Sequence, residues 1–323
     1  MSAAPPAVIP AAGAGAAPTT PRDTPRDALA PPGVGRTLRA YVALTKPRII
    51  ELLLVTTLPT MLLAADGVPP VGTVVATVVG GALAAGSANA YNQYFDRDID
   101  AVMTRTHHRP IPSGVIGPRA ALGYATVLGA AATALLWWFT TPLAAALSVL
   151  AILMYVVGYT LILKRRTPQN IVWGGAAGCM PVLIAWAAVT GELSAAAAVL
   201  FLVVFFWTPP HYWPLSLRFR DDYAAAGVPM LPVVAPASAV ARQVLGHTAA
   251  MVAATLLLVP VAGMGWVYSV AAVVAGAVFV VSAAGFARRL RRGEPPRAMR
   301  LFHVSISYLT VVFVAVGVDV LAR

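Results

Sequence analysis

The stretch from Val71 to Asp100 reads V-G-T-V-V-A-T-V-V-G-G-A-L-A-A-G-S-A-N-A-Y-N-Q-Y-F-D-R-D-I-D. Its first part is apolar for more than the roughly 18 residues that an α-helix needs to cross a bilayer. Its end carries three aspartates and two asparagines within twelve residues. This order predicts a membrane-spanning helix that delivers a group of oxygen-bearing side chains to one face of the membrane.

The composition extends this interpretation to the whole chain. Of its 323 residues, 59% are hydrophobic and only 11% are charged, whereas soluble domains carry about 25% charged residues. The mean hydropathy is +0.77. We therefore expect an all-α, polytopic membrane protein with nine transmembrane helices, at 49–66, 71–93, 120–139, 142–162, 171–190, 194–213, 244–262, 265–287 and 301–321.

The basic residues predict the orientation. With nine spans, 22 of the 23 Lys and Arg residues lie in the N-terminal segment and in the loops 94–119, 163–170, 214–243 and 288–300. Only Arg323 lies on the other side. The positive-inside rule places the N-terminus and these loops in the cytoplasm, or in the matrix of a mitochondrion. The net charge of +11 is thus explained by topology, and no nucleic-acid partner is predicted.

The N-terminal segment differs from the rest of the chain. Residues 1–36 are rich in Ala and Pro, and we expect a disordered cytoplasmic tail, followed by a helical domain over 37–323. The tail has no compact apolar region of a secretory signal. Because it is rich in proline and contains Asp23 and Asp27, it also differs from a transit peptide. This favours a bacterial plasma membrane over the mitochondrial inner membrane.

The polar end of the quoted stretch predicts a metal site. Because a helix advances about 100° per residue, Asn89, Asn92, Asp96 and Asp100 occupy one stripe, and Asp98 points the opposite way. Two carboxylates one turn apart at a membrane edge repel each other, and a divalent cation removes that cost. Mg²⁺ is commonly held by one or two carboxylates together with substrate phosphates. The alternative is that these acids only end the helix and pair with nearby arginines.

Basic residues downstream suit a phosphate ligand. Arg105 and Arg109 lie four residues apart, and a guanidinium binds phosphate oxygens with a planar pair of donors. Lys164 and Arg165 end the fourth predicted span on the same side. They form either an ordinary topogenic cluster or part of the same anion site.

The sixth predicted span ends in W-T-P-P-H-Y-W at 207–213. The pair Pro209–Pro210 predicts a break or a kink in this helix. His211 follows it at the membrane border, where a histidine is either structural or functional. Asp221 and Asp222 form a second acidic group, after the one at 96–100.

Four ordered motifs carry a resemblance to a known family. They are N-x-x-x-D-R-D-I-D-x-x-M-x-R-T-x-x-R-P at 92–110, Y-T-x-x-L-K-R-R-T-P-x-N-I-V at 159–172, W-T-P-P-H-Y-W at 207–213 and D-D-Y-x-x-A-G-V-P-M-L-P at 221–232. Over about 37–323 the chain resembles the UbiA superfamily of intramembrane prenyltransferases and, within it, the protohaem IX farnesyltransferases (haem O synthases). Many relatives carry a second D-x-x-x-D motif, whereas this chain has adjacent aspartates there.

The resemblance implies nine helices around a central cavity, capped by two aspartate-bearing cytoplasmic loops. It implies transfer of a farnesyl group from farnesyl diphosphate to a vinyl group of haem b, with Mg²⁺ as the cofactor and haem O as the product. Asn92, Asp96 and Asp100 would hold Mg²⁺ against the diphosphate, and Arg105 and Arg109 would neutralise its remaining oxygens. The product would pass to a haem A synthase or to terminal oxidase assembly.

Further residues are expected to contact the substrates. The aromatic rings of Tyr91, Tyr155, Tyr159 and Tyr212 would stabilise an allylic carbocation. His211 would orient haem or ligate its iron, with His303 as a weaker candidate, while His107 and His108 are expected in an exposed loop. The substrate-binding set is Asn89, Tyr159, Lys164, Arg165, His211, Asp221 and Asp222.

Two other functions fit parts of the sequence. A prenyltransferase for an aromatic or quinone-precursor acceptor would use the same metal stripe without needing T-P-P-H-Y-W. A transporter would instead carry its polar residues near the membrane midplane on broken helices. Because the acids cluster at one face, the transporter is the weakest of these readings.

Overall fold

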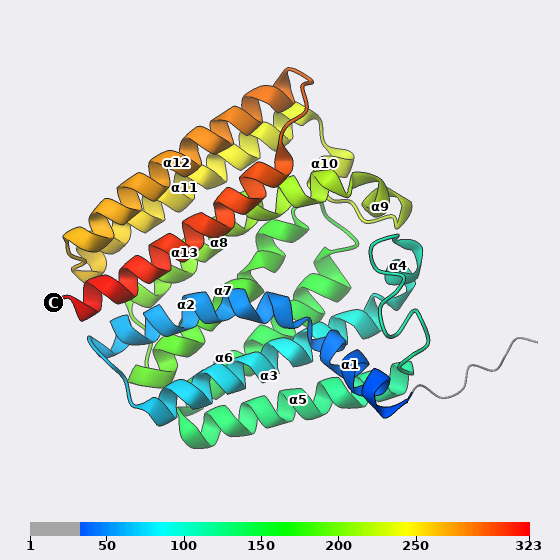
Figure 1. Cartoon of the computed structure of the whole chain (residues 1–323), viewed down its shortest axis with the longest axis horizontal. Coiled ribbons are helices and arrows are strands. Elements are labelled where there is room, and N and C mark those ends of the chain that lie inside the picture. The colour runs from blue at the N-terminus through cyan, green and yellow to red at the C-terminus, as the bar shows by residue number, and fades with distance from the viewer. Residues whose placement is uncertain (1–32) are drawn as a thin grey trace, which may run out of the picture.

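The computed structural model describes residues 33–323, without the side chains of 48–54, and this part of the chain contains helices and no strand. Its long helices lie side by side in one bundle (Figure 1). The elements in chain order are α1 (Val34–Thr45), α2 (Pro47–Ala65), α3 (Val71–Phe95), α4 (Arg97–Val102), α5 (Pro118–Phe139), α6 (Pro142–Leu153), the π-helix η1 (Met154–Leu163), α7 (Asn170–Thr190), α8 (Ala195–Arg218), α9 (Arg220–Ala225), α10 (Leu231–Val234), α11 (Ala237–Ala262), α12 (Trp266–Arg291) and α13 (Ala298–Leu321).

The all-α membrane class is confirmed. Within the described residues, eight helices are long and apolar enough to cross a bilayer, counting α6 and η1 as one continuous span. The predicted spans match them to within a few residues at most edges, although α11 begins at Ala237 rather than at 244. The remaining predicted span, 49–66, corresponds to α2, whose described apolar part is Val55–Ala65. The count of nine therefore remains a prediction.

Local signals set the helix ends. Proline occupies the first turn of α2, α5 and α6, where its missing N–H has no helical partner to lose. Thr141 Oγ1 accepts a hydrogen bond of 3.1 Å from Ala144 N at the start of α6, and Ser194 caps α8 in the same way. Gly191 ends α7 in the left-handed conformation, as glycine commonly does after a helix.

Small residues allow the helices to approach closely, as is typical in lipid. A Cβ atom on Gly80 of α3 would lie 2.7 Å from Leu136 Cγ of α5, so these two helices pack at a distance that only glycine permits. On the other side of the bundle, α8, α11, α12 and α13 share a core with fully buried Trp213, Tyr268 and Phe279. The bundle is therefore packed in its centre as well as exposed to lipid on its outside.

The sequence predicted a break or a kink in α8, and the break is wrong. The helix continues from Ala195 to Arg218 through Pro209, Pro210 and Pro214. Proline has a φ close to the helical value, and both Pro209 and Pro210 are buried against neighbouring helices. Packing therefore keeps the helix intact although three backbone donors are missing.

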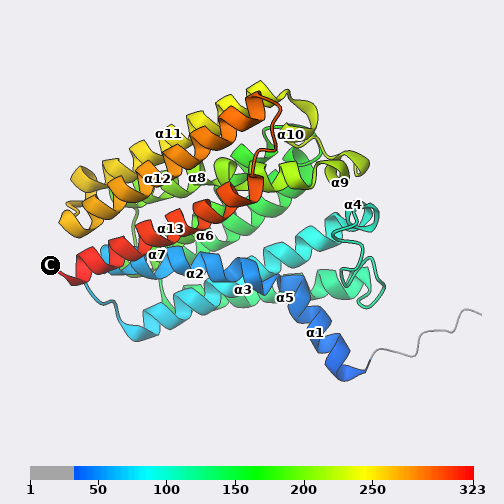
Figure 2. The ribbon, with the colours of Figure 1, turned by 45° about the horizontal axis from the view of Figure 1, so that its top comes forward.

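The charged segments share one end of the molecule. Figures 1 and 2 show α1, α4, α9, α10 and the connection between α12 and α13 at one end, and the C terminus at the other. This arrangement agrees with the asymmetry of the basic residues. The proposed tail lies mostly in residues 1–32, outside the described residues, and its boundary at 36 falls within α1.

Candidate functional site

A cavity of about 370 Å³ lies at this charged end, between α2, α3, η1, α7 and α8. Its wall combines ionic and aromatic side chains in a largely apolar setting. The predicted residues that line it are Asn92, Asp100, Arg105, Arg109, Tyr155, Tyr159, Lys164 and Tyr212.

Asp96 lies behind the wall of this cavity and is fully buried. Its Oδ2 is 2.5 Å from Lys164 Nζ and accepts a hydrogen bond of 2.6 Å from Asn92 Nδ2. Its Oδ1 has no hydrogen-bond donor, and Arg165 Nη2 lies 3.5 Å from it. The carboxylate thus keeps one oxygen with unused acceptor capacity.

Asp100 follows one turn later, at the edge of the cavity. Both of its carboxylate oxygens accept from Arg109 Nη1, at 2.9 and 2.8 Å. Asp98 lies between the two buried aspartates in sequence but points away, as predicted, and pairs with Arg165 at 2.7 Å. The hydrogen bond from Arg165 lowers the pKa of Asp98 to about 2.

Lys46 belongs to the cavity wall, and the sequence analysis did not assign it to the site. It lies between α1 and α2 with a left-handed φ of 52°, which is uncommon for a residue other than glycine. Its Nζ donates to Asn92 Oδ1 at 2.9 Å. Burial of the ammonium, followed by repulsion from Arg109 and Lys164, lowers the pKa of Lys46 to about 7. The signal in the sequence was the run L-T-K-P-R at 44–48.

The π-helix η1 and the residue that ends it present three side chains to the cavity. These are Tyr155 and Tyr159 of η1 and Lys164 directly after it, with spacings of four and five residues. In a π-helix the hydrogen bonds join residues five apart, and Lys164 N accordingly bonds Tyr159 O at 2.8 Å. The wider turn brings Lys164 onto the same side as the tyrosines, so that its ammonium reaches Asp96.

Gly174 of α7 determines how close Tyr159 can come to that helix. A Cβ atom at this position would lie 2.2 Å from Tyr159 Cδ2, which is too close for two carbon atoms that are not bonded to each other. The glycine therefore makes room for the tyrosine ring in the cavity wall.

The residues present suit a magnesium ion that is completed by a phosphate ligand. Within the described part of the chain, no three His, Cys, Asp or Glu side chains cluster as a metal site of their own. Mg²⁺ needs only one or two carboxylates when substrate phosphates and water supply the other ligands. Asp100 and Asn92 present oxygens at the cavity wall, and Asp96 lies behind that wall with one acceptor, Oδ1, that has no donor. This set meets the requirement.

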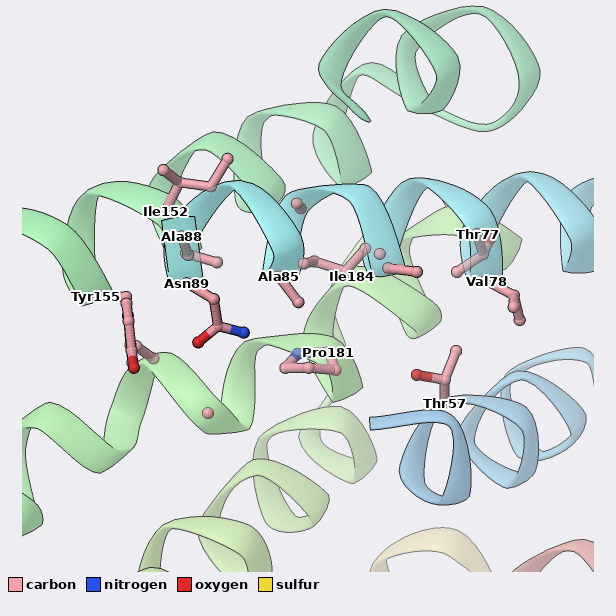
Figure 3. Close-up of a pocket in the computed structure, with 16 residues that line it drawn as sticks. Thr57, Thr77, Val78, Ala85, Ala88, Asn89, Ile152, Tyr155, Pro181 and Ile184 are labelled. Carbon is pink, nitrogen blue, oxygen red and sulfur yellow. The ribbon is translucent and has the colours of Figure 1, made fainter. Parts of the chain in front are cut away.

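A second cavity, of about 130 Å³, continues from the first into the membrane-spanning part of the bundle. Tyr155 and Gly178 line both cavities. Figure 3 shows Asn89 and Tyr155 at one end of this second cavity and Thr77 at the other. Its lining is mostly alanine, glycine and aliphatic side chains. Asn89 therefore lines the apolar cavity instead of the ionic one, and its Nδ2 donates to Thr45 O at 3.0 Å.

His211 lies in α8 between the rings of Trp207 and Phe302, with ring centroids 4.1 and 4.6 Å away. Its Nδ1 is 2.7 Å from Ser305 Oγ. Because the Ser305 hydroxyl donates to Phe302 O at 2.6 Å, the serine oxygen accepts from the histidine. This assigns the proton to Nδ1 and leaves a lone pair on Nε2. His211 is not part of the ionic cavity wall.

The remaining candidates lie nearer the surface. Asp222 accepts from Thr104 Oγ1 at 2.6 Å and from Arg105 N at 3.3 Å, so it ties the loop after α4 to α9. Asp221 is exposed on α9. The other surface positions are His107, His108 and His303, which are exposed, and Tyr91, whose hydroxyl bonds Thr126 of α5 at 2.8 Å.

Comparison with known proteins shows the family of the chain. The UbiA prenyltransferase family matches residues 53–306. A protohaem IX farnesyltransferase of Pseudarthrobacter chlorophenolicus is 57% identical over 301 residues, which are 92% of this chain and 94% of the relative. The same enzyme of Paenarthrobacter aurescens is 57% identical over 289 residues, 89% and 90% of the two chains.

Solved structures share the fold at low sequence identity. A digeranylgeranylglyceryl phosphate synthase superimposes with a TM-score of 0.72 at 17% identity, over 89% of this chain and 99% of its own. A UbiA homologue from Archaeoglobus fulgidus, bound to GPP and Mg²⁺, gives a TM-score of 0.62 at 16% identity, over 88% and 100% of the two chains. The helical bundle, the ionic cavity and the 57% identity lead to one assignment: the chain belongs to the UbiA prenyltransferase family, alongside the protohaem IX farnesyltransferases.

Proposed function

We propose that this prenyltransferase moves a farnesyl group from farnesyl diphosphate to a vinyl group of haem b, giving haem O and diphosphate. One observation carries this proposal: an ionic cavity and an apolar cavity meet at Tyr155 and Gly178. A prenyl diphosphate has the same two halves. The substrates themselves are inferred from the names of the relatives at 57% identity.

The charges of the ionic cavity suit a diphosphate leaving group. Lys46, Arg105, Arg109 and Lys164 line it against one carboxylate, that of Asp100. Fixed donors around the leaving oxygens stabilise negative charge as it develops in the transition state. The basic side chains therefore serve both to bind the substrate and to lower the barrier to loss of diphosphate.

We assign Asn92, Asp96 and Asp100 to a magnesium site. When bound there, the ion would add positive charge at the diphosphate oxygens. The homologue from Archaeoglobus fulgidus with GPP and Mg²⁺ supports this use of a divalent ion in the family.

The reaction breaks the C1–O bond of farnesyl diphosphate and forms a bond from C1 to the terminal vinyl carbon. Tyr155 and Tyr159 lie with ring centroids 5.5 Å apart in the wall of the ionic cavity, where aromatic faces stabilise a cation. Water then adds at the other vinyl carbon and loses a proton, which gives a hydroxyethylfarnesyl group. The apolar walls limit the access of other water to the cation.

We propose that His211 acts on the haem acceptor. Its Nδ1–H is committed to Ser305, and its Nε2 lone pair is left to ligate iron. The stack on Trp207 and Phe302 fixes the ring plane. A fixed imidazole with one uncommitted nitrogen is the arrangement that metal-binding histidines use.

We also propose that the charged end faces the cytoplasm of a bacterial plasma membrane, because the positive-inside rule favours that side for 22 of the 23 basic residues. Asp221 and Asp222 then belong to a cytoplasmic cap over the cavity.

The test is mass analysis of haem from membranes that express the chain, supplied with farnesyl diphosphate, Mg²⁺ and haem b. We expect a haem heavier by one farnesyl group and one hydroxyl group. Asp100→Asn should reduce its formation by about 100-fold or more, since a charge at the reacting diphosphate is lost. Asp66→Asn, at an exposed aspartate of the opposite end, should leave it unchanged.

Removal of the metal with a chelator should stop the reaction, and added Mg²⁺ should restore it. Unchanged haem, together with transfer of the prenyl group to an aromatic acceptor and release of diphosphate, would retain the prenyltransferase and refute the haem assignment. Equal activity of Asp100→Asn and Asp66→Asn would refute the assigned site.

A further inference from the structure

The helix α1 is amphipathic, and one of its sides faces outward. Val34, Leu38 and Val42 recur every four residues and are all exposed, with Leu38 at 62%. On the other side, Ala40 and Leu44 are buried in a cluster with α3 and α5 residues. Figure 2 shows α1 leaving the bundle at an angle, at the charged end. A basic helix with such an apolar stripe lies in the membrane interface.

A third cavity, of about 510 Å³, lies between α1 and the loop that follows α4. No acidic side chain lines it, and Arg36 and Arg39 form no ion pair with any residue in the described part of the chain. The wall of the cavity is therefore positive, chiefly through Arg36 and Arg39, because Arg109 pairs with Asp100. Its basic lining residues are Arg36, Arg39, Lys46, His108 and Arg109.

Gln93 of α3 also lines this cavity and is almost fully buried. Its Nε2 donates to Leu44 O at 2.9 Å, which ties α3 to α1. Its Oε1 has no hydrogen-bond partner. A buried acceptor without a donor is destabilising, so this side chain leaves an unsatisfied polar group in the cavity wall.

We propose that this cavity binds the phosphate of an anionic lipid headgroup, beside the buried polar side chain of Gln93. The cations of the wall supply the recognition of phosphate, since each Lys or Arg near an anionic surface contributes about 1 kcal/mol. The apolar stripe of α1 favours a lipid over a dissolved phosphate, because it places the cavity at the depth of the headgroups. The proposal does not depend on the transferase reaction.

The site also touches the ionic cavity. Lys46 and Arg109 line both. A lipid phosphate held between α1 and the loop would therefore fix two of the cations that face the first cavity. Arg36 and Arg39 belong to the lipid site alone, which makes them suitable for a test.

The experiment uses the full chain purified in a neutral detergent and titrated with short-chain phosphatidylglycerol or phosphatidylcholine, with bound lipid counted by native mass spectrometry. We expect phosphatidylglycerol to bind more tightly. Arg36→Gln/Arg39→Gln should weaken its binding by about 10- to 30-fold, the effect of two cations at about 1 kcal/mol each. The control is Arg288→Gln/Arg291→Gln, which removes two exposed arginines from the end of α12 and should change nothing.

A second variant, Ala43→Trp, fills the cavity without changing its charge and should also weaken binding. Equal affinity for the two lipids, or equal loss in the two arginine variants, would overturn the proposal. Inorganic phosphate that displaces phosphatidylglycerol from the unaltered chain, with an affinity that Arg36→Gln/Arg39→Gln weakens equally, would show a site for dissolved anions and would overturn the assignment to a lipid.

Discussion

The pair of Asp96 and Lys164 should be the most costly ionic contact to break in this protein. The aspartate is fully buried, the lysine side chain is 11% exposed, and their atoms are 2.5 Å apart. Lys164→Met would leave the carboxylate with the Asn92 amide and with Arg165 at 3.5 Å. Removing one partner of a buried pair costs about 3–5 kcal/mol. Because Arg165 remains near, we expect a loss of about 3 kcal/mol.

The double variant Asp96→Asn/Lys164→Met removes both charges. Since replacing a buried pair with neutral groups is often close to neutral for stability, it should lie within about 1 kcal/mol of the unaltered protein. Its prenyl transfer should remain lost, because the charges of the site are gone. Stability and activity would thus separate in one pair of variants.

The matched control is Arg165→Met, which removes the partner of Asp98. That pair has a similarly short distance of 2.7 Å, but its side chains are 38% and 61% exposed. An exposed pair contributes about 0–1 kcal/mol. The assay is unfolding in mixed micelles with increasing dodecyl sulfate, followed by tryptophan fluorescence, with haem mass analysis alongside. If Lys164→Met costs no more stability than Arg165→Met, the argument from burial is refuted. It is also refuted if the losses of Asp96→Asn and Lys164→Met, measured singly, add up in the double variant.

Three further outcomes follow from the structure. Gly174→Ala should reduce prenyl transfer because the new Cβ displaces Tyr159, at an overpacking cost of about 1–3 kcal/mol. The control Gly246→Ala, whose Cβ meets no atom within 4 Å, should leave transfer unchanged, and equal transfer in both variants would refute the contact. The stabilising contribution of Asp98, whose pKa is lowered from 3.8 to about 2, should be complete above pH 4 and lost as the pH falls toward 2; a flat unfolding profile there would contradict it. Asp319→Asn should lower the unfolding midpoint, because this carboxylate accepts from two backbone N–H groups at 2.7 and 3.0 Å, while activity per folded molecule stays constant; a changed activity would contradict a purely structural role.

The transmembrane helices were accessible from the sequence because their signal is chemical and local. Long apolar runs separated by short polar connections locate a helix such as Pro142–Leu163 almost to the residue. The failure at α8 has the opposite cause. Pro209 and Pro210 are local signals for a break, but tertiary packing around the buried prolines overrides them.

The ionic cavity was predicted in its main members and not in its full extent. Asn92, Asp100 and Arg109 meet as the helical stripe and the spacing of the arginines suggested. The stripe assumed one straight helix through Asn89, yet α3 ends at Phe95 and the chain turns at Asp96. Lys46 was not assigned to the site although the run L-T-K-P-R at 44–48 contains it, because its position in the cavity wall depends on its left-handed backbone between two helices.

The π-helix accounts for the part of the site that sequence patterns could not supply. A search at 100° per residue places Tyr155 and Tyr159 near one another but turns Lys164 away by about 180° relative to Tyr155. In the structure the wider turns of η1 bring all three to the same cavity. The segment thus connects Tyr155, which lines both cavities, and Tyr159 to Lys164, whose ammonium pairs with Asp96. Because π-helices are rare on their own, we expect neighbouring helices to stabilise η1, and Gly174 of α7 leaves the space that the ring of Tyr159 occupies. The site therefore depends on a backbone irregularity stabilised by a glycine on another helix, which is a tertiary property of this bundle.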